Sequence, residues 1–154
     1  MLRPKPAAID RAAALRYMGA AGWQPDAPTG RLLAEAERQV LEAAVPRAVW
    51  RTLPREAFLP PDAGRDLERH LAGCGQVLAL TATLGGEVDR LLRRFELTDI
   101  ALAAAADALA SSLLEQVCDA LEEELRAELC KKGLYLTGRF APGYGDCPLE
   151  LNDA

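Results

Sequence analysis

The stretch that decides the fold is DIALAAAADALASSLLEQVCDALEEELRAELCKK, from Asp99 to Lys132. It contains no glycine or proline, and alanine, leucine and glutamate, all strong helix formers, dominate it. At 1.5 Å per residue, a helix over this stretch would be roughly 50 Å long. Its first half is small and apolar almost all round, whereas its second half is amphipathic. We therefore expect a long helix from about Thr98 to Lys132 that begins buried, emerges toward solvent and ends at a Gly133 cap.

Shorter helices are predicted on both sides of the two clearest strand patterns. Apolar residues recur at helical spacing over 9–18, from an expected N-cap at Thr29 to Pro46, over 65–71, and in EVDRLLRRFE (87–96). Three segments have strand composition: PRAVWRTL (46–53), QVLALTATL (76–84) and LYLT (134–137). The continuous apolar run from Val77 to Leu80 is typical of a central strand covered on both faces. The pattern predicts an α+β, or mixed α/β, fold in which a small sheet packs with the long helix.

Length and composition suit one domain over residues 1–154, in which residues 1–8 form a loose arm. The chain is 50% hydrophobic and carries a net charge of −5, and it has no basic cluster, so we expect no nucleic-acid partner. The apolar runs are too short to span a bilayer and the first residues have no apolar signal core. The expected location is the cytoplasm, without a membrane partner.

The cysteines and the single histidine limit the chemistry. Cys74, Cys118, Cys130 and Cys147 show no CxxC spacing, and Cys118 and Cys130 fall within helical pattern as expected buried side chains. His70 is the only histidine, so a cluster of imidazole metal ligands is excluded and we assign no metal site and no catalytic residue. Since DLERHLAGC reads as the end of a helix, His70 is expected to have a capping or surface role.

Two further patterns could bind ligands but have simpler explanations. The glycine pair in TLGGEVD could approach an anion, yet Glu87 and Asp89 would repel it, so a plain turn between strand and helix is favoured. Glu115 and Asp119 lie one helical turn apart and could serve acid–base chemistry or a cation. Without an evident third oxygen ligand, a surface or ion-paired role is favoured for them.

The strongest candidate site is the loop RFAPGYGDCP, from Arg139 to Pro148. Its two prolines and two glycines restrict and permit particular backbone angles, and a loop that is already constrained loses little entropy on binding. Arg139 offers a planar fork for a carboxylate, and the backbone around Ala141 and Gly143 could bond a ligand. Tyr144 can stack on a ligand or lie beside a cation. Asp146 shows no clear ligand role.

These segments together resemble the activation (reactivation) domain of cobalamin-dependent methionine synthase, in its short stand-alone form. The resemblance covers most of the chain and runs through ALRYMG (14–19), PRAVWR (46–51), TLGGEVDRLLRRFELTDIA (83–101), the long helix and YLTGRFAPGYGDCPLEL (135–151). The family carries an Arg-x-Ala-Pro-Gly-Tyr-x-x-Cys-Pro signature. The chain matches it at every defined position: Arg139, Ala141, Pro142, Gly143, Tyr144, Cys147 and Pro148.

The resemblance implies S-adenosylmethionine binding, in which Arg139 meets the carboxylate, Ala141, Gly143 and their neighbours contribute backbone contacts, and Tyr144 lies against the ligand. Glu115 corresponds by rough alignment to an acid on the family's long helix. The implied role is to present the methyl group to cobalamin held by a partner, a cobalamin-binding methyltransferase module, with an electron from a flavodoxin-like protein. The chain would then be a methyltransferase component rather than a self-sufficient catalyst.

Two differences from the family bear on the site. The family holds the ligand's amino group with an early aspartate, whereas the region around Tyr17 has no acid closer than Asp10 and Asp26. The family's domain also continues with more strand and helix after the signature, so we expect a C-terminally shortened domain. The alternative function is a structural or assembly subunit that docks a corrinoid protein without binding S-adenosylmethionine.

Overall fold

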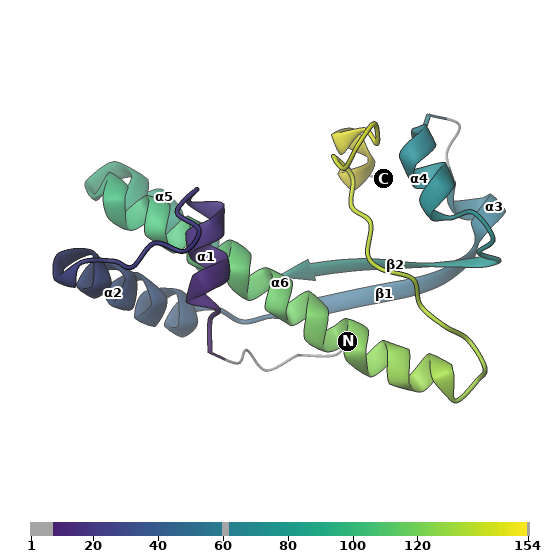
Figure 1. The fold of residues 1–154 in the computed structure, drawn as a ribbon, viewed down its shortest axis with the longest axis horizontal. Helices are drawn as coiled ribbons and strands as arrows, with labels where there is room; N and C mark the ends of the chain where they lie inside the picture. Colours follow the sequence, from purple (N-terminus) through teal and green to yellow (C-terminus); the bar gives the residue numbers. More distant parts are fainter. Residues whose placement is uncertain (1–7, 60–61, 154) are drawn as a thin grey trace. The chain divides into compact units, whose positions relative to one another are not determined.

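The computed structural model describes residues 8–59 and 62–153 (Figure 1). It is mixed α/β, with one two-stranded antiparallel sheet and one long helix, which confirms the coarse fold class. The elements in chain order are α1 (Arg11–Tyr17), α2 (Ala27–Ala43), β1 (Arg47–Pro54), α3 (Arg55–Phe58), α4 (Arg65–His70), β2 (Gln76–Thr83), α5 (Gly86–Thr98), α6 (Ile100–Cys130) and the 3-10 helix η1 (Leu149–Asp153).

The chain divides into two compact units, each with its own hydrophobic core. The first unit comprises residues 1–49 and 81–128, and the second comprises residues 50–80 and 129–154. Both strands and α6 contribute residues to each unit. The expectation of one domain over 1–154 stays a prediction, and its loose arm lies almost wholly outside the described residues.

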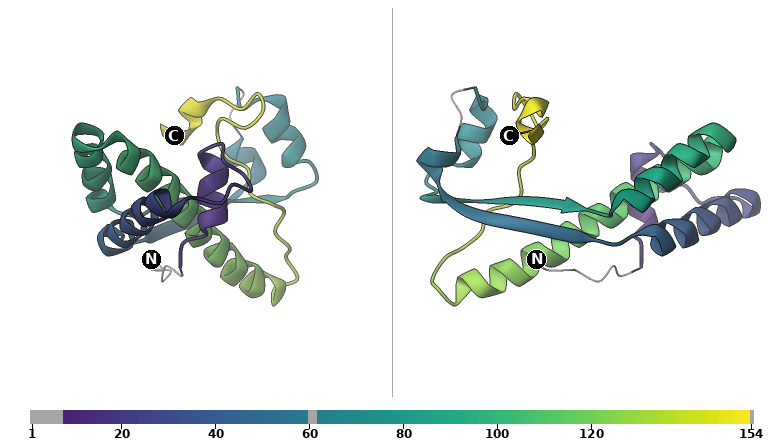
Figure 2. Two further views of the ribbon diagram at one scale, coloured as in Figure 1. Left: turned by 60° about the vertical axis from the view of Figure 1, so that its left-hand side comes forward. Right: turned by 180° about the vertical axis from the view of Figure 1, so that it is seen from behind.

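The core of the first unit forms where α1, α2, α5 and the first half of α6 meet. Figures 1 and 2 show α2 and α5 side by side, and the two helices are in contact. The apolar stripe predicted for α5 is confirmed, because Val88, Leu91 and Phe95 are buried. In α6, most of the buried residues are alanines, whose small side chains let neighbouring helices approach closely. Its buried members in this core are Ala103, Ala105, Ala106, Ala108, Leu109, Ala110, Leu113 and Val117.

Two polar side chains of α6 attach the segment before α1 to this core. The Gln116 amide accepts the Asp10 N–H at 3.0 Å and donates to the Ala8 carbonyl at 2.8 Å, much as a neighbouring strand would. Ser112, which is 1% exposed, donates its hydroxyl hydrogen to the Asp10 carbonyl at 2.8 Å. The buried hydroxyl is therefore satisfied, and the N-terminal segment is held at two adjacent points.

The long helix α6 runs without interruption from Ile100 to Cys130, as predicted. Its cap is as expected, since Gly133 donates to the Cys130 carbonyl at 3.0 Å and Leu134 donates to the Leu129 carbonyl at 3.0 Å, the paired bonds of a Schellman motif. By length and composition it is a helix that could cross a membrane, but half of its most apolar window is buried inside the protein, and a core helix meets the same criterion.

Two expected helix starts were wrong by a few residues. The N-cap of α2 is Asp26 rather than Thr29, because the Asp26 carboxylate accepts the Thr29 N–H at 3.0 Å. The hydrogen bond with the Thr29 side chain, followed by that with its backbone N–H, lowers the pKa of Asp26. Thr98 is the last residue of α5, and α6 begins after Asp99, whose carboxylate accepts the N–H groups of Ala101 and Leu102 at 3.1 Å each. In both places a carboxylate is the cap, consistent with the preference of helix N-termini for acceptors.

The strand predictions were partly right. β1 and β2 form as expected, but β2 pairs with β1 in a two-stranded sheet, so the expected central position of β2 was wrong. Val77 is buried and Leu78 to Leu80 are half-buried. The segment 134–137 is not a strand, because within the described residues it has no neighbouring strand to pair with. The expected burial of Cys130 was also wrong: it is exposed at the end of α6, while Cys118 is half-buried.

Candidate functional site

The signature loop, residues 139–148, lies in the second unit and leads from the irregular segment after α6 into η1. Figures 1 and 2 show this C-terminal segment beside α4. Three backbone bonds fold the loop on itself: Tyr144 N–H to the Ala141 carbonyl at 3.1 Å, Cys147 N–H to the Tyr144 carbonyl at 3.0 Å, and Gly143 N–H to the Cys147 carbonyl at 3.0 Å. The loop therefore consists of consecutive turns rather than of a helix or a strand.

Asp146 fixes the loop to the start of α4. Its carboxylate accepts the N–H of Arg65 at 3.0 Å and that of Asp66 at 2.9 Å, so it caps a helix whose own N-cap residue, Gly64, has no side chain that could do so. The hydrogen bond from Asp66, followed by that from Arg65, lowers the pKa of Asp146. Sequence reasoning missed this role, because the two partners lie some eighty positions earlier.

The contact between loop and helix is close enough to require glycine at two positions. Gly145 has φ of +56°, and a Cβ there would run into the Asp66 carboxylate. Gly64 has φ of +86°, and a Cβ there would lie 2.6 Å from the Asp146 carbonyl oxygen. Both glycines are therefore explained by the approach of the loop to α4.

The loop is also attached through its apolar and aromatic side chains. Cys147 is buried in the core of the second unit with Ala63, Leu67, Leu71 and Val77. At the other end of α4, His70 Nε2 lies 2.9 Å from the Gly138 carbonyl oxygen. The His70 ring packs on Phe140 with centroids 5.2 Å apart, and Phe140 meets Tyr144 edge-on at 5.8 Å. His70 thus contacts the loop, a role beyond the expected capping or surface position.

The predicted ligand residues divide between two elements. Arg139, Ala141, Gly143 and Tyr144 share the loop, where Arg139 and Tyr144 are exposed, Tyr144 by 56%. Within the described residues, the N–H of Ala141 and the carbonyl of Gly143 have no intramolecular partner, which leaves these two backbone groups for a ligand. Glu115 lies on α6 in the first unit, where it is exposed.

The glycine-pair turn has the simple structure that was favoured for it. Gly85 follows β2 and precedes α5, and its N–H donates to the Thr83 hydroxyl at 3.0 Å. Glu87 in the first turn of α5 forms an ion pair with Arg90, whose hydrogen bond lowers the pKa of Glu87. The negative charge that complements the helix start is therefore supplied by the helix itself.

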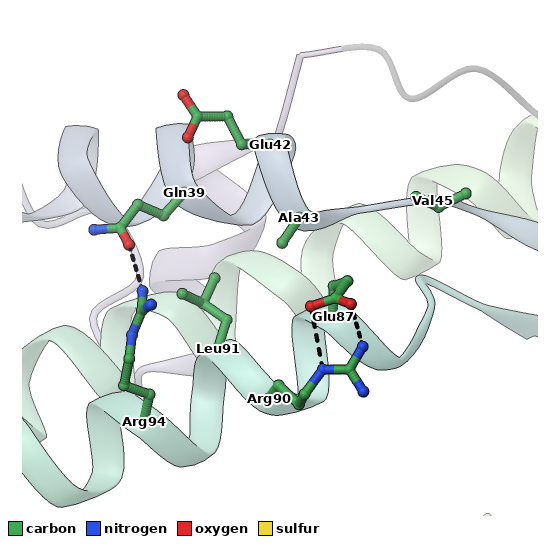
Figure 3. A pocket seen from close by; sticks show the side chains of 8 residues that line it. All are labelled: Gln39, Glu42, Ala43, Val45, Glu87, Arg90, Leu91 and Arg94. Atoms are coloured by element: carbon green, nitrogen blue, oxygen red, sulfur yellow. Dashed lines mark hydrogen bonds and ion pairs between the residues drawn. The ribbon is translucent and has the colours of Figure 1, made fainter.

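A separate hollow of about 630 Å³ lies between α2 and α5 in the first unit (Figure 3). Its two arginines are already engaged: Arg90 pairs with Glu87, and Arg94 donates to Gln39 at 2.9 Å. The hollow contains none of the predicted ligand residues, and its lining consists of Gln39, Glu42, Ala43, Val45, Glu87, Arg90, Leu91 and Arg94. Its charges balance, so it offers no net attraction to an anion or a cation.

No protein-family model matches this chain, and no curated protein does. The site must therefore be assessed from its own residues. A guanidinium and a phenol ring belong to a loop that is attached at both ends, with the N–H of Ala141 and the carbonyl of Gly143 between them in the chain. This arrangement suits a small ligand that carries a carboxylate together with an apolar or cationic part.

Proposed function

We propose that this chain binds S-adenosylmethionine at the loop 139–148 and serves as a reactivation component of a cobalamin-dependent methionine synthase or a related corrinoid methyltransferase. One observation carries the proposal: the complete signature forms a single anchored loop that leaves Arg139 and Tyr144 exposed. The finer fold assignment, a shortened activation-type domain, belongs to the same proposal.

The chemistry of the ligand fits the groups of the loop. The guanidinium of Arg139 holds the carboxylate through charge-assisted bonds, and the ring of Tyr144 lies beside the sulfonium cation. The N–H of Ala141 and the carbonyl of Gly143 contact the adenine or the amino-acid end.

The chain's contribution to methyl transfer is positioning. A cobalamin-binding methyltransferase module in the cytoplasm holds the corrinoid, a flavodoxin-like donor supplies the electron, and S-adenosylmethionine supplies the methyl group and leaves as S-adenosylhomocysteine. The chain itself holds the donor in a defined orientation and is a component of the methyltransferase, without catalytic residues of its own.

A specific observation favours the alternative function, an assembly subunit that docks the corrinoid protein without the ligand. Cys147, a signature residue, is buried in the core of the second unit, so part of the signature could persist for structural reasons without binding. The two functions differ in one measurable property, which is the affinity of the isolated chain for S-adenosylmethionine.

Calorimetric titration of S-adenosylmethionine into the full chain tests the proposal. We expect Arg139→Ala to weaken binding roughly 10- to 100-fold, because a hydrogen bond to a charged group is lost, and Arg139→Lys to restore only part of it. Tyr144→Ala should weaken binding more than Tyr144→Phe if the ring surface matters most. S-adenosylhomocysteine, which lacks the sulfonium charge, should bind less tightly.

Exposed residues of the same types in the second unit provide matched controls. Arg51 on β1 and Tyr135, which is 83% exposed, lie outside the loop, so Arg51→Ala and Tyr135→Ala should leave the affinity unchanged. If the wild-type chain shows neither heat nor thermal stabilisation with millimolar ligand, the binding function is rejected. Capture of a cobalamin-binding module by that same protein would then support the assembly function.

A further inference from the structure

The two residues that flank Arg139 in the chain are both held by one side chain of α4. His70 Nε2 lies 2.9 Å from the carbonyl oxygen of Gly138, directly before Arg139. The same imidazole packs on the ring of Phe140, directly after Arg139, at 5.2 Å between centroids. Arg139 therefore lies in a backbone segment that is fixed on each side, while the residue itself is exposed.

We propose that His70 is a positioning residue for the signature loop. Through His70, α4 holds the loop in the conformation that orients the Arg139 guanidinium and the Tyr144 ring. This inference rests on the proposed function for its ligand, but its structural part can be measured without one. No sequence motif pointed to His70, whose pattern indicated only the end of a helix.

The hydrogen bond defines the chemical form of His70. A carbonyl oxygen can only accept, so Nε2 must carry the hydrogen, and the neutral ring is the Nε2–H tautomer. The bond also lies at the end of α4 opposite to the one capped by Asp146. One six-residue helix thus holds the chain at Gly138, directly before the loop, and again at Asp146, and residues 139–145 of the loop lie between these two points.

The aromatic contacts extend this positioning to Tyr144. Phe140 lies between His70 and Tyr144, with an edge-on contact of 5.8 Å to the latter. A shift of His70 would therefore disturb both exposed ligand groups, Arg139 directly through its neighbours and Tyr144 through Phe140. A loop fixed in its binding conformation before the ligand arrives loses less entropy on binding, which increases affinity without adding a contact.

Three substitutions separate the two contacts of His70. His70→Gln keeps an N–H donor but loses the ring, His70→Phe keeps the ring but loses the donor, and His70→Ala removes both. Hydrogen exchange of the Tyr144 and Cys147 amides, both bonded within the loop, reports loop opening in the ligand-free chain. The amides of Leu109 and Leu113 in α6 report whether the first unit stays folded.

We expect His70→Ala to accelerate exchange of the loop amides roughly two- to tenfold and to weaken S-adenosylmethionine binding by a similar factor, as the loss of one hydrogen bond implies. His70→Gln and His70→Phe should each recover part of both effects, which an unspecific loss of stability would not produce. Because His70 is the only histidine, nitrogen-15 spectra contain a single imidazole, and under conditions in which that ring is neutral they should show its Nε2–H tautomer.

The possible failures can be told apart. An Nδ1–H tautomer, or unchanged loop exchange in His70→Ala, overturns the attachment of the loop by His70. Wild-type affinity in His70→Ala, with faster loop exchange, overturns its role in positioning while the proposed function stands. Absence of any S-adenosylmethionine binding to the wild-type chain overturns the proposed function and the ligand role together, whatever the exchange data show.

Discussion

At the residue scale, Asp146 is the loop residue whose pKa is clearly shifted by the fold. Its folded pKa lies below the ordinary value of 3.8, because the charged carboxylate accepts two backbone N–H groups of α4. A depressed folded pKa means that the stabilisation is fully present above the unfolded pKa and disappears as the pH falls through the folded pKa. The bond between the loop and α4 should therefore be intact at neutral pH and weaken as the pH falls below 3.8.

This pH dependence can be followed at the two donor amides. As the pH is lowered below 3.8, the proton shifts of the Arg65 and Asp66 amides should titrate with the pKa of Asp146, and their protection from exchange should fall. Asp146→Asn should abolish that titration and lower the melting temperature, so Asp146 is unsuitable as a neutral control for ligand binding. A titration midpoint at or above 3.8 would contradict the assignment.

Gly145 in the loop and Gly138, directly before the loop, offer a matched pair of substitutions. Gly145→Ala should destabilise the second unit by about 1–3 kcal/mol, because φ is +56° and the new Cβ would meet the Asp66 carboxylate. Gly138→Ala should have little effect, since Gly138 lacks a positive φ and a Cβ there would meet no atom within 4 Å. Chemical denaturation of both variants checks this, and equal effects would argue against close packing at Gly145.

At the scale of elements, the small residues of α6 determine how closely the helices of the first unit pack. Ala105 is fully buried, whereas its neighbour Ala104 is exposed. Ala105→Leu should lower the free energy of unfolding by about 1–3 kcal/mol through overpacking, while Ala104→Leu should stay within about 0.5 kcal/mol of wild type. Denaturant titration of the two variants measures this difference, and a stable Ala105→Leu variant would indicate a loosely packed core.

The elements that the sequence predicted well are those whose signals are local. The long helix and the stripe of Val88, Leu91 and Phe95 follow from periodicity within one segment, and the structure confirms both. The segment 134–137 has strand composition, but a strand requires a partner elsewhere in the chain, and β1 and β2 pair with each other. Asp146 and His70 were missed for the same reason, because their partners are distant in sequence.

At the scale of the whole molecule, the two units differ in how much core each possesses. Among the described residues, eighteen buried side chains form the core of the first unit, but only five form that of the second. Burial of apolar surface is the main favourable term in folding, so a core of five residues, two of them alanine and cysteine, stabilises little. The signature loop belongs to this smaller unit, where local opening should occur most readily.

Hydrogen exchange should therefore reveal two levels of stability, with the Cys147 amide exchanging through a lower free energy of opening than the Leu109 amide.

Leu67 on α4 is buried in the second core and Leu33 on α2 is buried in the first. Leu67→Ala should remove about 2–5 kcal/mol from the second unit, enough to open the loop, and leave Leu109 protected. Leu33→Ala should lower the protection of Leu109 instead. If both substitutions reduce protection equally at both amides, the chain unfolds as one cooperative domain, as its length and composition predicted, and the loop is then only as mobile as the molecule as a whole.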